Sequence, residues 1–252
     1  MAGVYWWDDK MREYLELIYK GTKDDYYKYL DSLLKNDQKK FIITANPETL
    51  SMAKKDEEVN KMLLDTNNSV VPDGVSIIKA GKVLKIDFKE RIPGVDICEY
   101  LLKYASEYKK KVYIFGSKEE TLIALNEKIK SNYSGINLVG LTNGYVKDRD
   151  KEFEKIKQTK PDIVIVALGI PYQEKLIYKH LDDFDKGIFI GVGGSLDVLS
   201  GCKRRAPKIF IKLNLEWFYR IISEPKRIKR FINNNVNFII QVKKESVGKN
   251  ND

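Results

Sequence analysis

The sequence predicts an α/β fold, with an open, mostly parallel Rossmann-like sheet flanked by helices and a basic helical appendage at its C-terminal end. Three observations support this prediction. Short apolar runs recur along the chain, amphipathic stretches separate them, and a basic, aromatic stretch follows the last run. Continuous apolarity is typical of strands that are buried on both faces of a parallel sheet. We therefore divide the chain into a helical region 1–40, an α/β core 41–212 that holds the site, and an appendage and tail 213–252.

The elements follow in order along the chain. Tyrosine, tryptophan and charge in residues 1–40 predict two short helices, around 10–19 and 24–34. A first strand, 41–45, precedes a helix that Pro47 opens and that runs through Met62 and Leu63. Residues 83–88 predict a small hairpin arm or a loop over the site. The remaining expected elements are strands 111–115, 136–141, 162–168 and 187–192. Residues 233–252 end in a polar Lys-Asn-Asn-Asp tail that is expected to be disordered.

Composition restricts the partners without selecting one. Forty-five Lys and Arg against 36 Asp and Glu give a net charge of +9, which favours nucleotides, phospholipid or nucleic acid. Cys98 and Cys202 are too few for a disulfide scaffold, so we expect the reducing cytoplasm. No stretch approaches the roughly 18 apolar residues of a spanning helix, and we therefore expect any membrane contact to be peripheral.

Metal chemistry finds little support in the sequence. His180 is the only histidine, which excludes zinc sites built on paired histidines. Asp148 and Asp150 have a spacing that could hold a divalent ion, but they open a charged helix, where acidic residues favour the helix dipole. We prefer the helix-capping interpretation and expect neither a metal nor a cofactor.

Glycines and polar residues follow the predicted strands, at the edge where open α/β sheets bind ligands. The candidates for substrate binding are Gly116, Asn143, Tyr145, Gly169, Gly191, Gly193, Gly194, Ser195 and Asp197. Glycines at 191–194 allow backbone N–H groups to approach a ligand, and Ser195 is expected to cap a helix whose positive end favours anions. A diphosphate is the natural ligand for such a loop.

Three further motifs contain candidate catalytic residues, and each motif also has an ordinary structural explanation. Thr44 and Asn46 place a hydroxyl and an amide at the exit of a strand, although Thr or Asn before Pro47 is a common helix start. Asp73 stands in a Pro-Asp-Gly turn, which is also common without any function. Gln173 lies in the first turn of a helix, where capping explains Glu174 better than it explains Gln173.

The C-terminal appendage combines basic and aromatic side chains, as expected for a surface that lies on anionic lipid or binds another phosphate. A solvated basic face is the ordinary alternative. Its members are Arg220, Lys226, Arg227, Lys229 and Arg230, with Trp217, Phe218, Tyr219 and Phe231. The spacing of Arg220, Arg227 and Arg230 predicts one face of a continuous helix, which Pro225 kinks.

Six motifs in residues 41–231 occur in the order found in one enzyme family. They are Thr44-x-Asn46-x-Glu48, Asp73-Gly74, Arg91-x-x-Gly94-x-Asp96, Gly169-x-Pro171-x-Gln173-Glu174, the 191–207 segment with Asp197, Gly201 and Arg205-Ala206-Pro207, and Glu216-Trp217-x-x-Arg220 with Glu224-Pro225-x-Arg227. With these motifs the chain resembles the WecG/TagA/CpsF glycosyltransferases, glycosyltransferase family 26. Residues 1–40 do not resemble the usual N-terminal strand pair of that family.

The resemblance implies inverting, metal-independent transfer of a sugar, usually N-acetylmannosamine, from a UDP-sugar donor. The implied acceptor is polyprenyl-diphosphate-linked N-acetylglucosamine at the inner face of the membrane, and the product primes teichoic acid or another surface polysaccharide. Asp73 would be the base, Thr44 would orient the acceptor or sugar, and Asn46 and Gln173 would hydrogen-bond the sugar. Backbone amides at 191–195, helped by Arg220, Arg227 and Arg230, would stabilise the leaving UDP.

Two other classes of function stay open at this point. A non-catalytic, nucleotide-binding peripheral membrane protein would keep the glycine loop and the basic appendage without needing Asp73. A nucleic-acid binder would account for the charge, but no recognisable module is present, so we expect no nucleic acid partner. Homo-oligomerisation is not decided by the sequence.

Overall fold

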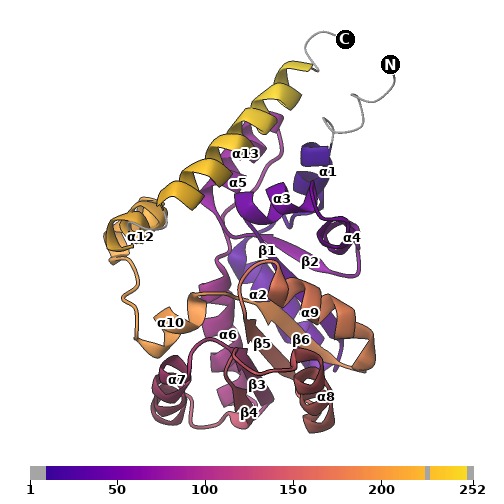
Figure 1. The fold of residues 1–252 in the computed structure, drawn as a ribbon, viewed down its shortest axis with the longest axis vertical. Coiled ribbons are helices and arrows are strands. Elements are labelled where there is room, and N and C mark those ends of the chain that lie inside the picture. The colour runs from indigo at the N-terminus through magenta and orange to yellow at the C-terminus, as the bar shows by residue number, and fades with distance from the viewer. Residues whose placement is uncertain (1–9, 225–227, 249–252) are drawn as a thin grey trace.

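A parallel six-stranded sheet forms the centre of the protein, as the computed structural model shows for residues 10–224 and 228–248 (Figure 1). The strand order is β2-β1-β6-β5-β3-β4, and every neighbouring pair is parallel. The strands are β1 (Lys39–Ala45), β2 (Ser69–Pro72), β3 (Lys111–Gly116), β4 (Asn137–Thr142), β5 (Ile163–Ala167) and β6 (Gly187–Gly191). The predicted open α/β sheet is confirmed.

Helices cover both faces of the sheet (Figure 1). One apolar layer contains α1 (Lys10–Leu17), α3 (Pro47–Ala53), α4 (Glu57–Leu64), α5 (Val75–Leu84), α8 (Arg149–Thr159), α9 (Tyr172–His180) and α13 (Ile228–Gly248). The opposite layer contains α2 (Lys23–Lys35), α6 (Gly94–Glu107), α7 (Glu119–Asn132) and α10 (Ser195–Ser200). Shorter elements are η1 (Leu181–Asp183), α11 (Lys208–Lys212) and α12 (Glu216–Ser223).

Strand β5 shows why the apolar runs are continuous. Val164 and Val166 pack into one layer, and Ile163 and Ile165 pack into the other, each with no exposed surface. Because both faces of the strand are buried, polar residues have no place in it. The five predicted strands are present. Burial explains the apolar runs of β1, β3, β5 and β6, whereas β4 is a partly exposed edge strand. Strand β2 escapes prediction because it has only four residues and ends in Pro72. Proline is tolerated there because β2 is an edge strand.

The predicted helix from Pro47 to Leu63 is two helices. Helix α3 ends at Ala53, and Asp56 caps a new helix, α4, by accepting hydrogen bonds from the backbone N–H groups of Glu58 and Val59. Of the two alternatives for residues 83–88, the hairpin arm is not found in the described chain, and a loop is present. Helix α5 ends at Leu84, and the following loop packs Phe88 closely over Gly81. The two predicted N-terminal helices are confirmed as α1 and α2.

The C-terminal segment is helical up to Gly248, and the polar tail that is expected to be disordered, 249–252, lies outside the described residues. Helix α13 lies alongside α5 and also packs against α3 and α1 (Figure 1). Phe238 and Val242 are buried in the core, and Ser76 Oγ donates a hydrogen bond to Asn235 Oδ1 over 2.7 Å. Among the polar residues between 233 and 248, apolar side chains form a stripe on one face of the helix. Burial of this stripe offsets the conformational entropy that is lost when the helix becomes ordered.

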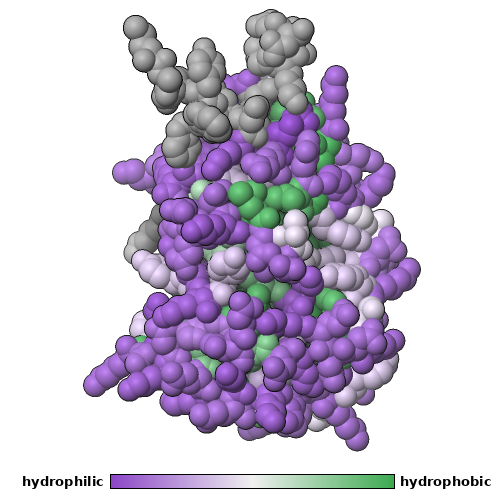
Figure 2. Space-filling view, turned by 90° about the vertical axis from the view of Figure 1, so that its right-hand side faces the viewer, coloured by the Kyte–Doolittle hydropathy of each residue, from purple (hydrophilic) through white to green (hydrophobic). Residues whose placement is uncertain are grey.

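The surface of the protein is largely hydrophilic on the face shown in Figure 2, where hydrophobic residues form separate patches. Among the helices of residues 10–224 and 228–248, none combines the length and the apolarity that are needed to cross a bilayer.

Candidate functional site

The loops beyond the carboxyl ends of the strands diverge at the centre of the sheet. The chain leaves β1 and β5 toward the layer that contains α3 and α9, but it leaves β6, which lies between them, toward α10 on the opposite face. Open α/β sheets bind their ligands at such switch points. Most of the sequence-predicted site residues lie at this edge, in three groups.

The first group follows β1 and β2 and contains Asp73. The Asp73 backbone N–H donates to the carbonyl of Ala45 over 3.0 Å, and its carboxylate Oδ1 accepts the N–H of Gly94, the first residue of α6, over 3.1 Å. Thr44 also packs against Gly94, because a Cβ atom on Gly94 would lie 3.1 Å from Thr44 Cγ2. Asp73 is partly exposed and Thr44 is buried. A carboxylate and a hydroxyl therefore lie beside one another at the rim of the sheet.

Asn46 belongs to the same rim and caps helix α3. Its Oδ1 accepts the backbone N–H groups of Glu48 over 2.9 Å and Thr49 over 3.1 Å. Helix capping, the ordinary explanation considered above, therefore accounts for the side-chain oxygen. The amide nitrogen of Asn46 is the part of the side chain that can serve as a donor to a ligand.

The second group joins the loops that follow β5 and β6 through Gln173. Gln173 Oε1 accepts the N–H groups of Gly169 over 3.0 Å and Gly193 over 2.9 Å. Its Nε2 donates to Glu174 Oε1 over 2.7 Å, and the residue is only 1% exposed. Gly191 must lack a side chain, because a Cβ atom there would lie 2.8 Å from Gln173 Nε2. The carboxamide binds its own chain here, and the expectation that it also binds the sugar stays a prediction.

The glycine loop after β6 differs from the expectation at Ser195. Gly194 occupies the N-cap position of α10, and Ser195 is the first helical residue. The N–H of Ser195 donates to the Val192 carbonyl, and the N–H of Gly193 donates to Gln173. The prediction that Ser195 caps the helix is wrong, because the chain turns one residue earlier at Gly194. Two of the amides expected to bind diphosphate therefore have partners within the chain.

The third group lies at the end of β3 and is mainly structural. Gly116 has φ of 121°, and a Cβ atom there would lie 2.3 Å from the Ala167 carbonyl oxygen, so it permits close packing of β3 and β5. Asp197 Oδ1 accepts the hydroxyls of Ser117 and Thr121, each over 3.2 Å, and Oδ2 pairs with Lys203 over 3.0 Å. Asp197 therefore fastens α10 to the loop after β3.

Asn143 and Tyr145 continue this third group after β4. Asn143 Nδ2 donates to Glu119 over 2.7 Å, and its Oδ1 accepts the Tyr145 N–H over 3.0 Å. The ring of Tyr145 is presented to solvent, because the residue is 74% exposed. Asn143 therefore shapes the loop, and Tyr145 is placed to contact a ligand.

The chain matches the model of the glycosyl transferase WecG/TagA/CpsF family over residues 15–252. It belongs to this family. The match includes residues 15–40, although the sequence of residues 1–40 is expected to diverge from that of the family. The chain is therefore a glycosyltransferase.

Relatives of this glycosyltransferase share most of its length. A protein of Bacillus subtilis (strain 168) named N-acetylglucosaminyldiphosphoundecaprenol N-acetyl-beta-D-mannosaminyltransferase is 39% identical over 208 residues, 81% of each chain. Proteins of the same name are 37% identical in Bacillus spizizenii, over 78% of this chain and 77% of theirs, and 38% identical in Staphylococcus aureus (strain MW2), over 75% and 74%.

The predicted arginines of this glycosyltransferase are divided between two helices. Helix α12 ends at Ser223 and α13 begins at Ile228, so the single continuous helix expected from the spacing is not found. Arg220 lies in α12 and Arg230 in α13, and for both the structure describes the helical backbone. Arg227 lies outside the described residues.

Ion pairs connect α12 and the segment before it to the core. Arg91 Nη2 lies 3.1 Å from Glu216 Oε2, and Lys203 Nζ lies 3.0 Å from both Asp197 Oδ2 and Glu224 Oε1. Arg205 also pairs with Asp96 of α6. The motif residues Arg91 and Glu216 thus join the loop before Gly94 to the appendage, a role that the sequence spacing does not reveal.

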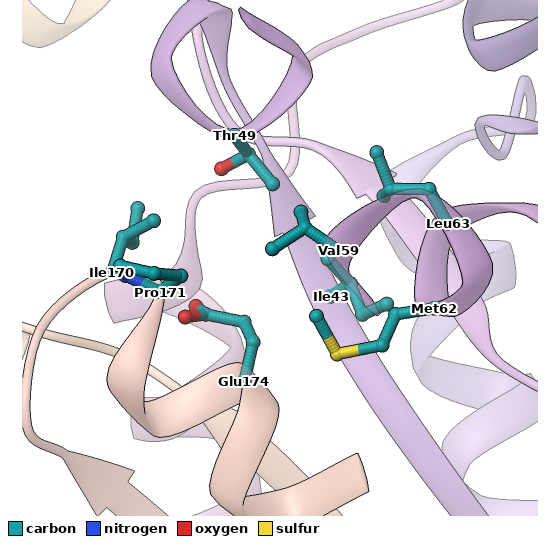
Figure 3. A pocket seen from close by; sticks show the side chains of 8 residues that line it. All are labelled: Ile43, Thr49, Val59, Met62, Leu63, Ile170, Pro171 and Glu174. Atoms are coloured by element: carbon teal, nitrogen blue, oxygen red, sulfur yellow. The ribbon is translucent and has the colours of Figure 1, made fainter. Parts of the chain in front are cut away.

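Glu174, for which the sequence favours a helix-capping role, is buried in the structure. It is 3% exposed, and with Ile43, Thr49, Val59, Met62, Leu63, Ile170 and Pro171 it lines a small cavity (Figure 3). Burial, with the charge of Glu48 nearby, raises the pKa of the Glu174 carboxyl to about 7. An acidic residue in a first helical turn is usually solvated, so nothing local in the sequence indicates this burial.

The potential metal ligands do not converge at the strand ends. Within residues 10–224 and 228–248, no three His, Cys, Asp or Glu side chains are grouped so that they could hold a metal ion. Asp148 caps α8 by accepting the Lys151 N–H over 3.1 Å, which confirms the capping interpretation for this residue. His180 contacts Asp150 and Asp183 and stacks on Phe153, away from the strand ends.

Proposed function

We propose that this glycosyltransferase moves N-acetylmannosamine from a UDP-sugar onto N-acetylglucosamine linked to undecaprenyl diphosphate, as a step in teichoic acid or other surface polysaccharide synthesis. The printed names of its relatives support the substrates. The observation that carries the proposal is the position of Asp73, whose carboxylate is oriented by Gly94 beside Thr44 at the ligand-binding edge.

Asp73 would act as the base of an inverting displacement. The acceptor hydroxyl forms a bond to the anomeric carbon as the bond from that carbon to the UDP oxygen breaks, and the hydroxyl proton passes to the Asp73 carboxylate. A positioned base contributes typically 10²- to 10⁴-fold to such a step. Thr44 and the Asn46 amide nitrogen would hold the sugar or acceptor, since both lie on the same rim.

The leaving UDP takes the electron pair and needs positive charge around its diphosphate. We assign most of this role to Arg220, Arg227 and Arg230, because the amides of Gly193 and Ser195 have partners within the chain. Tyr145 and the loop at Gly194 are exposed and would contact the donor. No metal is assigned to the reaction.

The appendage would place the enzyme on the inner face of the cell membrane. Trp217, Phe218 and Ile222 of α12 are 36%, 44% and 59% exposed. Helix α13 exposes a further stripe, which consists of Ile228, Ile232, Val236, Ile239 and Ile240. Apolar side chains beside basic residues suit an anionic lipid surface, where each Lys or Arg contributes about 1 kcal/mol. Peripheral attachment from the cytoplasm would bring the core to a lipid-linked acceptor.

A donor panel tests the proposed function. The full chain is incubated with a lipid-diphosphate N-acetylglucosamine acceptor and one of several UDP-sugars, and the products are separated by mass. We expect transfer from UDP-N-acetylmannosamine with inverted anomeric configuration, and much slower transfer from UDP-N-acetylglucosamine. Binding of UDP without transfer from any donor would instead favour the non-catalytic nucleotide-binding protein.

A further inference from the structure

We propose that Glu174 is a positioning residue for sugar transfer, because its carboxyl oxygen holds the Gln173 carboxamide in the orientation that fastens the loops after β5 and β6. This inference rests on the proposed function, which places the UDP-sugar at these loops. Glu174 would touch neither substrate, since it is 3% exposed and lies behind Gln173.

The orientation of the Gln173 carboxamide follows from its partners. Its oxygen accepts two backbone N–H groups, from Gly169 and Gly193, which belong to two different loops. If the carboxamide rotated by half a turn, its NH₂ group would face those two donors and both hydrogen bonds would be lost. Glu174 Oε1 prevents the rotation because it is an acceptor, 2.7 Å from Gln173 Nε2, and only the nitrogen end of the carboxamide satisfies it.

The position of Glu174 connects the two halves of the site. Its cavity is lined from α3 by Thr49, from α4 by Val59, Met62 and Leu63, and from β1 by Ile43 (Figure 3). Helix α3 starts at Pro47, and its cap, Asn46, lies two residues after Thr44, whereas the carboxyl group of Glu174 accepts a hydrogen bond from Gln173. One buried side chain thus lies between the rim that carries the proposed base and the loops that would carry the donor.

The surroundings of Glu174 are unusual for a carboxyl group. Its Oε2 and the Thr49 hydroxyl both lack a hydrogen-bond partner in the described part of the chain, and both line the same apolar cavity. Burying a polar group without partners is costly, so a glutamate here stabilises the fold less well than an apolar residue would. A role in holding Gln173 explains why an acceptor stands at this position.

The charge state of Glu174 should change the strength of its hydrogen bond to Gln173 near neutral pH. Glu48 of α3 is the charged group that acts on Glu174, while Lys175, the next residue of α9, pairs with Asp56 and Glu58 over 2.6 and 3.1 Å. Burial raises the pKa of Glu174 to about 7, so the carboxyl ionises between pH 6 and 8. A hydrogen bond to an ionised acceptor is stronger than one to a neutral acceptor. The hydrogen bond from Gln173 to Glu174 should therefore become stronger as pH rises.

Three substitutions in the full chain test the inference. Glu174→Met keeps the length of the side chain and removes the acceptor, Glu174→Gln keeps an acceptor that cannot ionise, and Glu120→Met is the matched control in the exposed first turn of α7. The Michaelis constant for UDP-N-acetylmannosamine, kcat and the dissociation constant of UDP are measured at pH 6, 7 and 8, together with the unfolding midpoint.

We expect Glu174→Met to raise the donor Michaelis constant and the UDP dissociation constant about tenfold, the loss typical of one buried hydrogen bond, with a smaller change in kcat. Glu174→Gln should retain donor binding but lose the tightening between pH 6 and 8 that the wild type shows. Glu120→Met should behave as the wild type. If Glu174→Met does not fold, the pH profile of Glu174→Gln decides.

Two results would overturn the inference. The first is a change in the unfolding midpoint of Glu174→Met with donor and UDP binding as in the wild type, which would show a purely structural residue. The second is a wild-type pH profile in Glu174→Gln. If the wild type binds UDP but transfers no sugar, the proposed function fails, and the UDP dissociation constants of the same variants still test the role of Glu174.

Discussion

Arg91 and Glu216 form an ion pair over 3.1 Å between the core and the appendage, and their side chains are only 16% and 5% exposed. Arg91 lies three residues before Gly94, whose N–H orients the Asp73 carboxylate. Glu216 is the first residue of α12. The same short loop therefore contacts both the proposed base and the appendage that would supply the arginines.

Substitution Glu216→Gln should detach the appendage from the core. Removing one partner of a buried ion pair leaves the other charge unpaired, at a cost of about 3 kcal/mol. We expect faster proteolysis within residues 213–252 and turnover reduced at least tenfold, with UDP binding less affected. The exchanged pair Arg91→Glu with Glu216→Arg should recover part of the protection. Wild-type proteolysis and turnover in Glu216→Gln would contradict the coupling.

Glu174→Gln should change how stability depends on pH. The pKa of Glu174 is raised from 4.5 to about 7, so the unfolded chain ionises first and the wild type loses stability as pH rises through this window. The shift corresponds to about 3 kcal/mol. In urea unfolding, the free energy of unfolding of the variant should rise relative to that of the wild type by about 3 kcal/mol between pH 4.5 and 8. Parallel pH profiles of the two proteins would show that the carboxyl is not buried.

Gly116→Ala should destabilise the fold strongly. The new Cβ would lie 2.3 Å from the Ala167 carbonyl oxygen, and φ of 121° is unfavourable for alanine. We expect a loss of more than about 2 kcal/mol in the free energy of unfolding. Gly74→Ala is the control for stability, because its Cβ would be 3.8 Å from the nearest atom. Equal unfolding midpoints of both variants would contradict the packing of β3 on β5.

Substitutions on the exposed face of α13 should affect membrane binding, and substitutions on its buried face should affect stability. Replacing the exposed Ile232, Val236 and Ile239 together by serine should reduce sedimentation with phosphatidylglycerol vesicles several-fold and leave the unfolding midpoint nearly unchanged. Phe238→Ala removes a fully buried ring and should instead destabilise the packing of α13 by about 3 kcal/mol. Unchanged vesicle binding of the triple variant would remove this stripe from membrane attachment.

The sequence predicted what depends on local pattern and missed what depends on tertiary contact. Strands such as β5 were predictable because both faces are buried, and Asp148 was recognisable as a helix cap. The internal bonding of Gln173 and the burial of Glu174 depend on loops distant in sequence, and no local signal marks them. A helical appendage was predicted, but the packing of α13 on the core was not, because its few inward residues, among them Phe238, are surrounded by polar ones.

The central claim is that Asp73 removes the proton of the acceptor hydroxyl, and Asp73→Asn tests it most directly. With saturating UDP-N-acetylmannosamine and lipid-linked acceptor, we expect kcat to fall by about 10²- to 10⁴-fold while the UDP dissociation constant stays within twofold of the wild type. The exposed Asp24→Asn, in the first turn of α2, is the matched control and should retain full activity. A kcat of Asp73→Asn equal to that of the wild type would contradict the account.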